Sequence, residues 1–249
     1  MDHIQLFPGE RIDQLYSQKI KIIQSSAVFS FSLDAVLLAD FAQVRTSSKA
    51  QIVDLCAGNG AVGLFVSQKT HAKITEIEIQ PELCDMARRS VTLNRLEEQI
   101  TVCQADLSDS LQFFTKESVD NVLVNPPYFP VAATSLKNPN QHLALARHEI
   151  ATNLATVVAM SSKLLKTGGT LFLVHRPERL TEILATLVHE RLVPKQMQLI
   201  YPRMGQAANL VLISAKKDGR PGGLKIKSPI VTYEGDKYSP YLQRLLYAK

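Results

Sequence analysis

The sequence predicts an α/β fold, in which a mostly parallel sheet of seven strands has helices on both faces and ends in an antiparallel strand pair. From residue 51 onward, short apolar runs alternate with segments long enough for a helix, as in parallel strands joined by right-handed crossovers. A glycine-rich turn follows the first of these strands, and acidic residues lie at the ends of three of them. Both features are typical of sheets that bind a nucleoside at their carboxyl edge.

The core elements follow one another in a regular order. Strands are expected at residues 52–55, 73–79, 100–103, 119–124, 170–175, 195–201 and 209–215. Helices are expected at residues 61–68, 81–94, 150–165 and 179–190, with Pro81 in the first turn, where its missing amide hydrogen costs nothing. A break at Gly168 and Gly169 precedes the fifth strand, and the short connection 202–205 makes the last two strands antiparallel.

The segments on either side of this core are predicted to be additions to it. Residues 14–19 and 20–24 form an expected hairpin, and residues 35–41 an expected helix with Ser32 as its N-cap. Residues 216–227 are basic, glycine-rich and poor in apolar side chains, so we expect a mobile loop there. The predicted partition is an N-terminal hairpin and helix extension (1–49), a cofactor-binding core (50–215) and a basic C-terminal segment (216–249) packed on the core.

The composition is that of a globular chain. Its 249 residues are 45% hydrophobic and 20% charged, which fits one large domain or one domain with an appendage. No run approaches the roughly 18 apolar residues needed to span a bilayer, and the N-terminus lacks the design of a secretory signal, so we expect a cytoplasmic protein. The three cysteines are scattered in apolar patterns, which predicts neither a disulfide framework nor a metal site.

The positive charge is concentrated near the C-terminus. The chain has a formal net charge of +5, whereas residues 203–249 alone carry +6 and the preceding residues about −1. A basic tail on a neutral body predicts a polyanionic partner, because phosphate contacts dominate nucleic-acid affinity. The alternative is a solvated surface that aids solubility.

A rigid corner, Asn125-Pro126-Pro127-Tyr128, follows the apolar strand 119–124. The two prolines remove backbone donors, which leaves the carbonyl oxygens of Asn125 and Pro126 without a nearby amide to pair with. The asparagine side chain adds another acceptor, and Tyr128 adds a flat aromatic face. This corner suits a planar group that carries an NH2.

A glycine turn and three strand-end acids predict a nucleoside site. Asp54 precedes the turn that contains Gly58 and Gly60, and these glycines allow the backbone to approach a ligand closely. Glu78 ends the second strand, where a carboxylate can accept both ribose hydroxyls, and Asp106 follows the third, where it can accept an adenine amino group.

The glycines and acids also fit a dinucleotide site or plain structural roles. Gly58, Gly60 and Gly63 match the dinucleotide pattern G-x-G-x-x-G, but Asp54 would repel a pyrophosphate and suits the cationic methionine end of S-adenosylmethionine. Taken singly, Glu78 can be a solvated acid, Asp106 a turn former and the prolines a loop stop. Their order and spacing together favour a binding site.

These segments resemble a known enzyme family. Residues 54–60, 76–82 and 124–128 are similar to the motifs of Rossmann-like, class I, S-adenosylmethionine-dependent N-methyltransferases. Residues 29–40 and 147–149 and the basic C-terminus further resemble the bacterial tRNA1(Val) adenine-37 N6-methyltransferase family. The resemblance covers nearly the whole chain, and Cys56 departs from it where many relatives have a glycine.

The resemblance implies a set of site residues. The target base is expected to contact Asn125, Pro126, Pro127 and Tyr128. The cofactor is expected to contact Ser32, Asp34, Asp54, Cys56, Gly58, Gly60, Glu78, Ile79, Asp106, Leu107 and Asn125. S-adenosylmethionine is the implied cofactor and tRNA the implied partner.

The implied chemistry is methylation of a weak nucleophile. The lone pair of an adenine N6 is delocalised, so we expect the Asn125 side chain and the Pro126 carbonyl to aim it at the methyl group, with no strong general base. Tyr128 would stack on the base, and Phe129 is either a second wall or a core residue. His148 is a weaker candidate than Asn125, and Arg147 and Arg203 are candidates for phosphate contacts.

Three functions remain open from the residues alone. The first is N6-adenine methylation of tRNA. The second is N-methylation of another planar amine, in a protein glutamine or an rRNA guanine. The third is a catalytically silent RNA-binding module. The sequence does not choose the RNA, the nucleotide or the oligomeric state.

Overall fold

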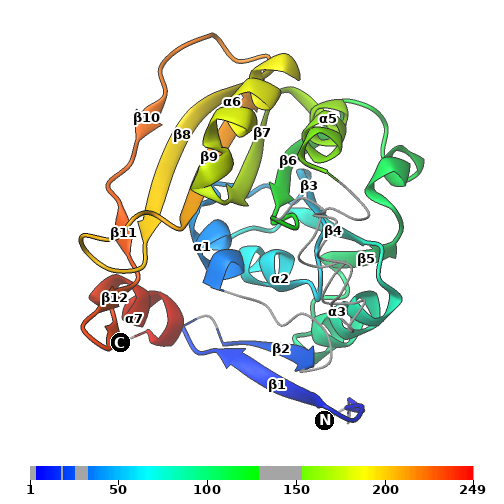
Figure 1. Cartoon of the computed structure of the whole chain (residues 1–249). Coiled ribbons are helices and arrows are strands. Elements are labelled where there is room, and N and C mark those ends of the chain that lie inside the picture. The colour runs from blue at the N-terminus through cyan, green and yellow to red at the C-terminus, as the bar shows by residue number, and fades with distance from the viewer. Residues whose placement is uncertain (1–3, 18, 26–32, 129–152, 249) are drawn as a thin grey trace, which may run out of the picture.

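The computed structural model describes residues 4–17, 19–25, 33–128 and 153–248. Its centre is a nine-stranded sheet in the order β10-β8-β9-β7-β6-β3-β4-β5, with β11 also paired to β8 (Figure 1). The long strands are β3 (Gln51–Leu55), β4 (Lys73–Glu78), β5 (Ile100–Gln104), β6 (Val119–Val124), β7 (Leu165–His175), β8 (Leu192–Tyr201) and β9 (Leu210–Lys217). Of these, β9 alone runs antiparallel to its neighbours, so the predicted α/β fold is confirmed.

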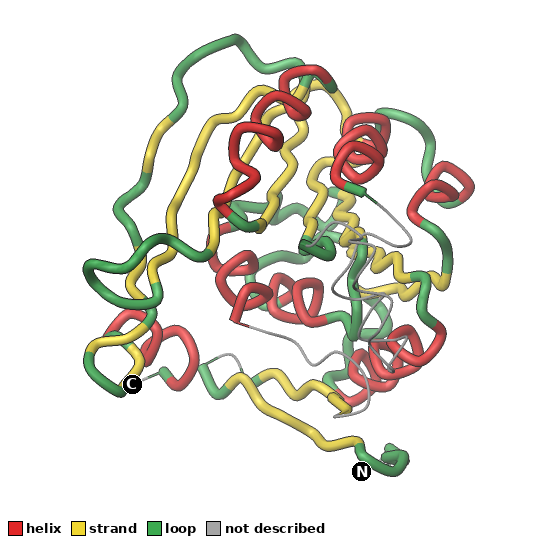
Figure 2. Tube along the Cα trace, in the orientation of Figure 1, coloured by secondary structure: helices red, strands yellow, loops and turns green. Residues whose placement is uncertain are grey.

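Helices cover both faces because the strands are apolar on both sides. Ile52 and Phe172 pack in one core cluster with α1 (Leu33–Phe41), α2 (Ala61–Ser67) and part of α3 (Pro81–Leu93). The alternate residues Val53 and Leu171 pack in a second cluster with α5 (Leu154–Leu164) and α6 (Leu180–His189). This alternation is the period of two that a strand imposes on its side chains. The central sheet therefore lies between two helical layers (Figure 2).

The sequence predicts a mobile loop at residues 216–227, and this prediction is wrong at both ends of the range. Lys216 and Lys217 complete β9, and Lys217 is buried with its ammonium group donating to Ser162 Oγ. Lys225–Ile226 forms β10, and Ile230–Val231 forms β11, both parallel to β8. The open edge of β8 offers backbone partners to a segment whose composition gives no strand signal.

The predicted break before the fifth strand is also wrong. β7 begins at Leu165, directly after α5, and includes Gly168 and Gly169. Gly168 has a φ of +79°, and the pairing of β6 with β7 is irregular between Val119 and Asn121. The glycines therefore form an irregular stretch within the strand rather than a stop. At the other end of α5, Asn153 is the N-cap and accepts a hydrogen bond from the Thr156 amide, so the helix begins at Leu154.

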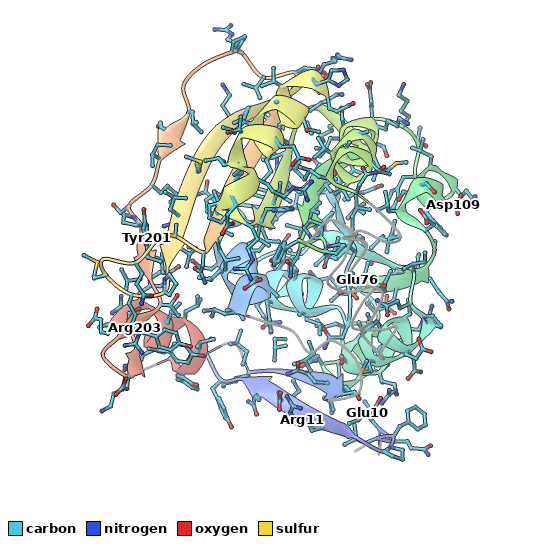
Figure 3. The ribbon with its side chains drawn as sticks, viewed as in Figure 1. Glu10, Arg11, Glu76, Asp109, Tyr201 and Arg203 are labelled. Atoms are coloured by element: carbon cyan, nitrogen blue, oxygen red, sulfur yellow. The ribbon has the colours of Figure 1, made fainter. Side chains whose placement is uncertain are left out.

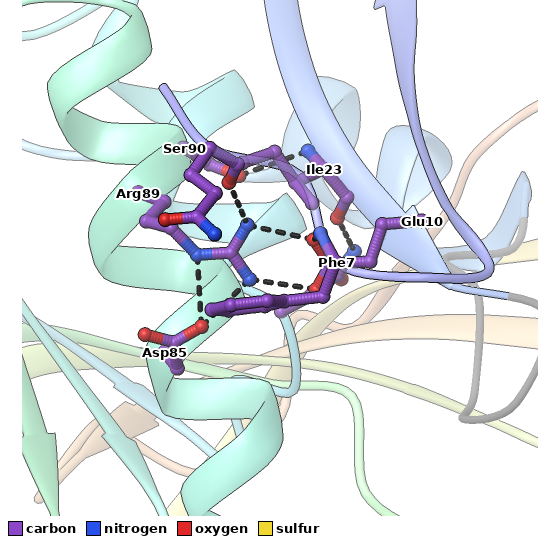
Figure 4. Close-up of polar contacts among 8 residues, drawn as sticks. Phe7, Glu10, Ile23, Asp85, Arg89 and Ser90 are labelled. Atoms are coloured by element: carbon purple, nitrogen blue, oxygen red, sulfur yellow. Dashed lines mark hydrogen bonds and ion pairs between the residues drawn. The ribbon is translucent and has the colours of Figure 1, made fainter. Parts of the chain in front are cut away.

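The N-terminal hairpin packs on α3. Its strands are β1 (Glu10–Leu15) and β2 (Ile20–Ser25), so the expected first strand at 14–19 is wrong in position. Arg89 of α3 pairs with Glu10 at 2.6 Å and lies over the Phe7 ring at 4.7 Å, while Ser90 Oγ accepts the Ile23 amide (Figure 4). The Arg89 guanidinium holds the pKa of Glu10 below its usual value. The hairpin is thus fixed to the layer that also contains α1 and α2.

Residues 233–247 form a small C-terminal unit beside both α1 and the hairpin. It consists of β12 (Tyr233–Glu234), β13 (Lys237–Tyr238) and α7 (Pro240–Tyr247). The Tyr241 hydroxyl donates to the Asp40 carboxylate of α1, and the Ser17 amide donates to the Leu246 carbonyl at 3.2 Å. In Figure 1 the hairpin and α7 accordingly lie on the same side of the molecule. The division into three segments stays a prediction.

The described residues also form two short 3-10 helices, η1 (Leu107–Gln112) and η3 (Pro177–Arg179). Within the described ranges, no helix has the length and apolar character needed to cross a membrane. In the same ranges, no group of three His, Cys, Asp or Glu side chains is arranged to hold a metal ion.

Candidate active site

Four predicted site residues meet at one edge of the sheet. The strand order β6-β3-β4-β5 places the carboxyl ends of these parallel strands side by side. Asn125 follows β6, Asp54 lies near the end of β3, Glu78 ends β4, and Asp106 follows β5. Ligands bind at this edge in open α/β sheets, and here the chain order of the strands brings the polar side chains together.

The turn after β3 has a left-handed backbone at three positions. The φ angles are +58° at Cys56, +60° at Gly58 and +81° at Gly60, which is also the N-cap of α2. A Cβ built on Gly58 would meet no heavy atom within 4 Å, so there is open space in front of this backbone. Cys56 adopts a left-handed conformation that glycine takes without strain and that is uncommon for a residue with a Cβ.

Glu78 ties the turn to the neighbouring strand. Its Oε2 accepts a hydrogen bond from the Gly58 amide at 2.9 Å, and its Oε1 accepts one from the Gln80 amide at 2.9 Å. Burial raises the pKa of this carboxyl, and the backbone donors oppose that shift. A carboxylate has about four acceptor positions, so Glu78 can hold the turn and still accept a hydroxyl group.

Asp54 and Glu76 form a buried carboxyl pair beneath the turn. They are paired across β3 and β4, and both are fully buried. Asp54 Oδ2 accepts the Gly63 amide of α2 at 3.1 Å, whereas Oδ1 has no partner within the described residues. Burial raises the pKa of Asp54 to about 8 and that of Glu76 well above its usual value. Asp54 therefore anchors the N-terminus of α2.

The side chain of Glu76 occupies the space where a side chain at Gly63, the third glycine of the dinucleotide-like pattern, would lie. A Cβ on Gly63 would lie 2.2 Å from Glu76 Oε1, and a Cβ on Gly60 would lie 2.6 Å from its Oε2. Figure 3 shows Glu76 beside α2. The match to G-x-G-x-x-G thus has a packing cause that involves no pyrophosphate. The sequence interpretation did not assign a role to Glu76, although its spacing of two from Glu78 places both acids on one face of β4.

Residues that follow β4 and β5 lie at the same edge as the glycine turn. We call this edge, with its strand-end acids, the crevice, because open α/β sheets bind ligands there. Ile79 is 42% exposed directly after Glu78, an apolar side chain suited to the flat face of an adenine. Asp106 Oδ1 accepts hydrogen bonds from the Ser108 amide at 2.8 Å and the Ser108 hydroxyl at 2.7 Å, so Asp106 is the N-cap of η1. Leu107 is buried in the core cluster that contains α5.

The corner after β6 is fixed by a tyrosine hydroxyl. The Tyr128 hydroxyl lies 2.7 Å from Asp34 Oδ2 of α1 and 2.6 Å from the side-chain oxygen position of Asn125. A phenol has one proton, and the carboxylate is the stronger acceptor. The phenol therefore donates its one hydrogen bond to Asp34, and its oxygen is left to accept one. Amide oxygen and nitrogen are assigned from such networks, so rotating the Asn125 amide by 180° lets its NH2 donate to the phenol oxygen. Asn125 Oδ1 is then directed away from Tyr128 and available to a substrate.

The sequence interpretation missed His175 and Arg176, which surround Tyr128. The Tyr128 and His175 rings meet edge to face at 5.3 Å, and the Arg176 guanidinium lies 5.5 Å from the Tyr128 ring centroid. Burial and the Asp34 carboxylate hold the pKa of Tyr128 well above its usual value. Position is the signal that could have found these residues. His175 ends β7, the neighbour of β6, and Arg176 follows it, so both lie at the same edge of the sheet as Asn125.

Not every predicted residue joins this cluster. Ser32, Phe129, Arg147 and His148 lie outside the described residues. Arg203 lies at the carboxyl end of β8, beside α7 (Figure 3), where it contacts the C-terminal hairpin rather than the crevice.

This architecture matches a known enzyme family. A model of the methyltransferase small domain matches residues 19–197, which is most of the chain. The chain belongs to this family. The methyltransferase is 26% identical over 72% of its length to a tRNA1(Val) (adenine(37)-N6)-methyltransferase of Porphyromonas gingivalis, of which 71% is covered. It is 28% identical over 75% of its length to a protein of the same name from Shewanella amazonensis, of which 77% is covered.

Solved structures show the same fold. A predicted O-methyltransferase from Agrobacterium tumefaciens superposes with a TM-score of 0.65 at 26% identity, over 85% of the methyltransferase and 94% of that chain. Geranyl diphosphate methyltransferase in complex with SAM superposes with a TM-score of 0.54 at 15% identity, over 74% of the methyltransferase and 84% of that chain. The predictions of a methyltransferase and of its Rossmann-like fold are confirmed.

The crevice of the methyltransferase fits S-adenosylmethionine, the cofactor that family membership supports. The open space before Gly58 admits a ligand close to the backbone, and Glu78 retains acceptor capacity for ribose hydroxyls. The buried Asp54 Oδ1, unpartnered among the residues described, suits an ammonium group. The contact of each of these residues with the cofactor stays a prediction.

Proposed function

We propose that this methyltransferase transfers a methyl group to the exocyclic N6 of an adenine in tRNA, at position 37 of tRNA1(Val). The observation that carries the proposal is the Asn125-Pro126 corner, which stands beside the glycine turn and is tied to α1 through Tyr128 and Asp34. The names of the relatives support the substrate, because three tRNA1(Val) adenine-37 N6-methyltransferases share 26–28% of aligned residues with the chain over about three quarters of its length.

The corner activates the amine by position and charge. When the base is bound, the Asn125 side-chain oxygen and the Pro126 carbonyl oxygen each accept one N6 hydrogen. These two acceptors favour a pyramidal nitrogen and direct its lone pair toward the methyl donor. Bound S-adenosylmethionine supplies an electrophilic methyl group on its sulfonium.

The mechanism does not require His175, the nearest described histidine to this corner, to act as a general base. Burial lowers the pKa of His175 to about 4, so its ring is neutral at pH 7. Its Nδ1 accepts the Arg176 amide at 2.7 Å, which places the ring proton on Nε2. The imidazole therefore has no free lone pair with which to take a proton. The proton displaced from N6 after methylation leaves to water.

Product identification tests the proposal. The protein is incubated with methyl-labelled S-adenosylmethionine and bulk tRNA, the RNA is digested to nucleosides, and the labelled nucleoside is identified. We expect N6-methyladenosine, and a tRNA1(Val) transcript with guanosine at position 37 should lose the label. Labelled guanosine, or label found in protein alone, would refute the proposal.

Asn125→Ala provides the variant for the same assay. Losing one oriented acceptor at the reacting group is expected to lower kcat by about 10²–10³-fold. A kcat equal to that of the wild type would show that the amide oxygen does not orient N6.

The cytoplasmic location predicted from the sequence stays a prediction. The basic C-terminal segment is proposed to contact the phosphates of the tRNA.

A further inference from the structure

A cavity lies outside the crevice, between the β12–β13 hairpin and α7. It has a volume of about 460 Å3 and is lined by Tyr233, Asp236, Lys237, Tyr238, Gln243 and Tyr247. None of these residues belongs to the methyl-transfer site described above. Five of the seven tyrosines of the chain gather around the C-terminal unit, which is a strong local enrichment for a sequence with 6% aromatic residues.

These tyrosines lie between the core and the surface: Tyr238 and Tyr241 pack partly against the core cluster of α1, whereas Tyr16 and Tyr247 are exposed. In α7, Leu242 is the buried residue, while Tyr247 is 42% exposed and pairs with the 60% exposed Tyr16 at 6.3 Å. Tyr233 and Tyr238 stack with 5.1 Å between ring centroids and 16° between ring planes. Half-buried stacked rings beside an exposed ring, all lining one cavity, are an arrangement typical of sites that bind planar groups.

Cationic and polar groups accompany the rings. The Arg203 guanidinium lies 5.6 Å from the Tyr233 centroid and forms an exposed ion pair of 3.6 Å with Asp236 of the cavity wall. Lys237 is an exposed cation of the same wall. The side-chain NH2 of Gln243 donates to the Tyr238 carbonyl at 2.7 Å, which leaves its side-chain oxygen as an acceptor. A base needs stacking faces, an acceptor for its edge and cations for its phosphates, and these residues supply all three.

The cavity also lies at the same edge of the sheet as the methyl-transfer site. β8 and β11 run parallel to β6 and β7, so Arg203 and Tyr233 follow the carboxyl ends of their strands as Asn125 follows β6. Three strand spacings separate β6 from β8, and a fourth leads to β11. At about 4.8 Å for each spacing this is about 19 Å, or about six nucleotides of a stacked strand.

We propose that this aromatic cavity binds an unpaired nucleobase of the RNA substrate, several nucleotides from the methylated adenine. The base stacks on the Tyr238 and Tyr247 side of the cavity, with Arg203 and Lys237 beside its phosphates. The proposal rests on the proposed function, since it assigns a second contact to the same RNA. It makes the C-terminal unit a substrate-holding element that takes no part in the chemistry.

Steady-state kinetics with bulk tRNA test the cavity. Tyr247→Ala removes an exposed ring, and the loss of one stacked base is expected to raise KM and Kd for tRNA about tenfold at fixed salt, with kcat unchanged. Tyr247→Phe keeps the ring and should remain within about twofold of the wild type. Phe113→Ala, which removes an exposed ring at the end of η1, is the matched control and should change neither constant.

Ultraviolet crosslinking of the unsubstituted protein to the same tRNA provides a second measurement that depends on no variant. We expect a nucleotide attached to a peptide from residues 233–247. An unchanged KM for Tyr247→Ala together with no crosslink in that peptide would overturn the assignment and leave the cavity to a protein partner or to internal packing. Formation of N6-methyladenosine by the wild type reports separately on the proposed function, and the crosslink can be read even if no methyl transfer occurs.

Discussion

The Tyr128 hydroxyl is the group whose removal gives the clearest prediction. Tyr128→Phe keeps the ring, with its contacts to His175 and Arg176, and deletes the two hydrogen bonds of 2.7 and 2.6 Å to Asp34 and Asn125. A hydrogen bond to a charged group contributes about 1.5–3 kcal/mol and a neutral one about 1 kcal/mol. We therefore expect the free energy of unfolding to fall by about 2–4 kcal/mol.

The same substitution should also affect turnover. Without the phenol, the Asn125 amide is free to rotate, and each 1.4 kcal/mol of lost orientation lowers the rate about tenfold. We expect kcat to fall about 10–100-fold while KM for tRNA changes little, because the ring that is expected to stack on the base remains. The measurements are urea unfolding followed by circular dichroism and steady-state methyl transfer to tRNA.

Asp34→Asn is the matched control. It keeps an acceptor oxygen for the phenol, so its kcat should lie between those of Tyr128→Phe and the wild type. If Tyr128→Phe retains kcat within twofold of the wild type, the phenol does not orient Asn125. The corner would then owe its geometry to its two prolines alone.

Three further outcomes follow from the buried acids and the basic segment. Gly63→Ala should lower the free energy of unfolding by about 1–3 kcal/mol in urea titrations, because its Cβ would lie 2.2 Å from the buried Glu76 carboxylate; stability equal to the wild type would contradict this packing. The pKa of Asp54 is about 8 in the folded protein and near 3.9 in the unfolded chain, so the folded state binds the proton more tightly. The contribution of Asp54 to the free energy of unfolding is therefore complete below pH 4 and is lost as the pH rises to 8, by at most about 1.4 kcal/mol per pH unit. Asp54→Asn should flatten that decline in urea titrations at pH 5–8, and an unchanged slope would show that the aspartate is not its source. Replacing the exposed Arg220 and Lys225 together by alanine should raise Kd for tRNA and lower the slope of log Kd against log salt by up to about two, whereas an unchanged slope would show that neither side chain contacts phosphate.

The sequence predicts the strands and their ends better than it predicts the contacts between them. Each core strand is an apolar run with a polar residue near its carboxyl end, so Asp54, Glu78 and Asn125 could be assigned to one edge before their neighbours were known. The association of Asp54 with Glu76 depends on the register of β3 against β4, which no local pattern shows. The same is true of the contact between Asp34 and Tyr128, which are 94 residues apart.

Short strands were the other source of error. β10 and β11 have two residues each, and their pairing depends on the free edge of β8 rather than on their own residue preferences. The dinucleotide-like glycine pattern had an unexpected cause, since Gly63 provides space for a carboxylate of the neighbouring strand. A glycine in a sequence shows that space is needed and does not show what fills it.

The contacts between the two ends of the chain determine when the substrate-holding unit can form. Ser17 meets the backbone at Leu246, and Asp40 meets Tyr241, 201 residues later. During synthesis, the hairpin and α1 emerge long before α7 exists to cover them, and contacts of such high sequence separation close late in folding. A nascent chain can therefore complete its glycine turn and acidic crevice before the aromatic cavity is assembled. Competence to hold RNA is expected to arise only after α7 has left the ribosome.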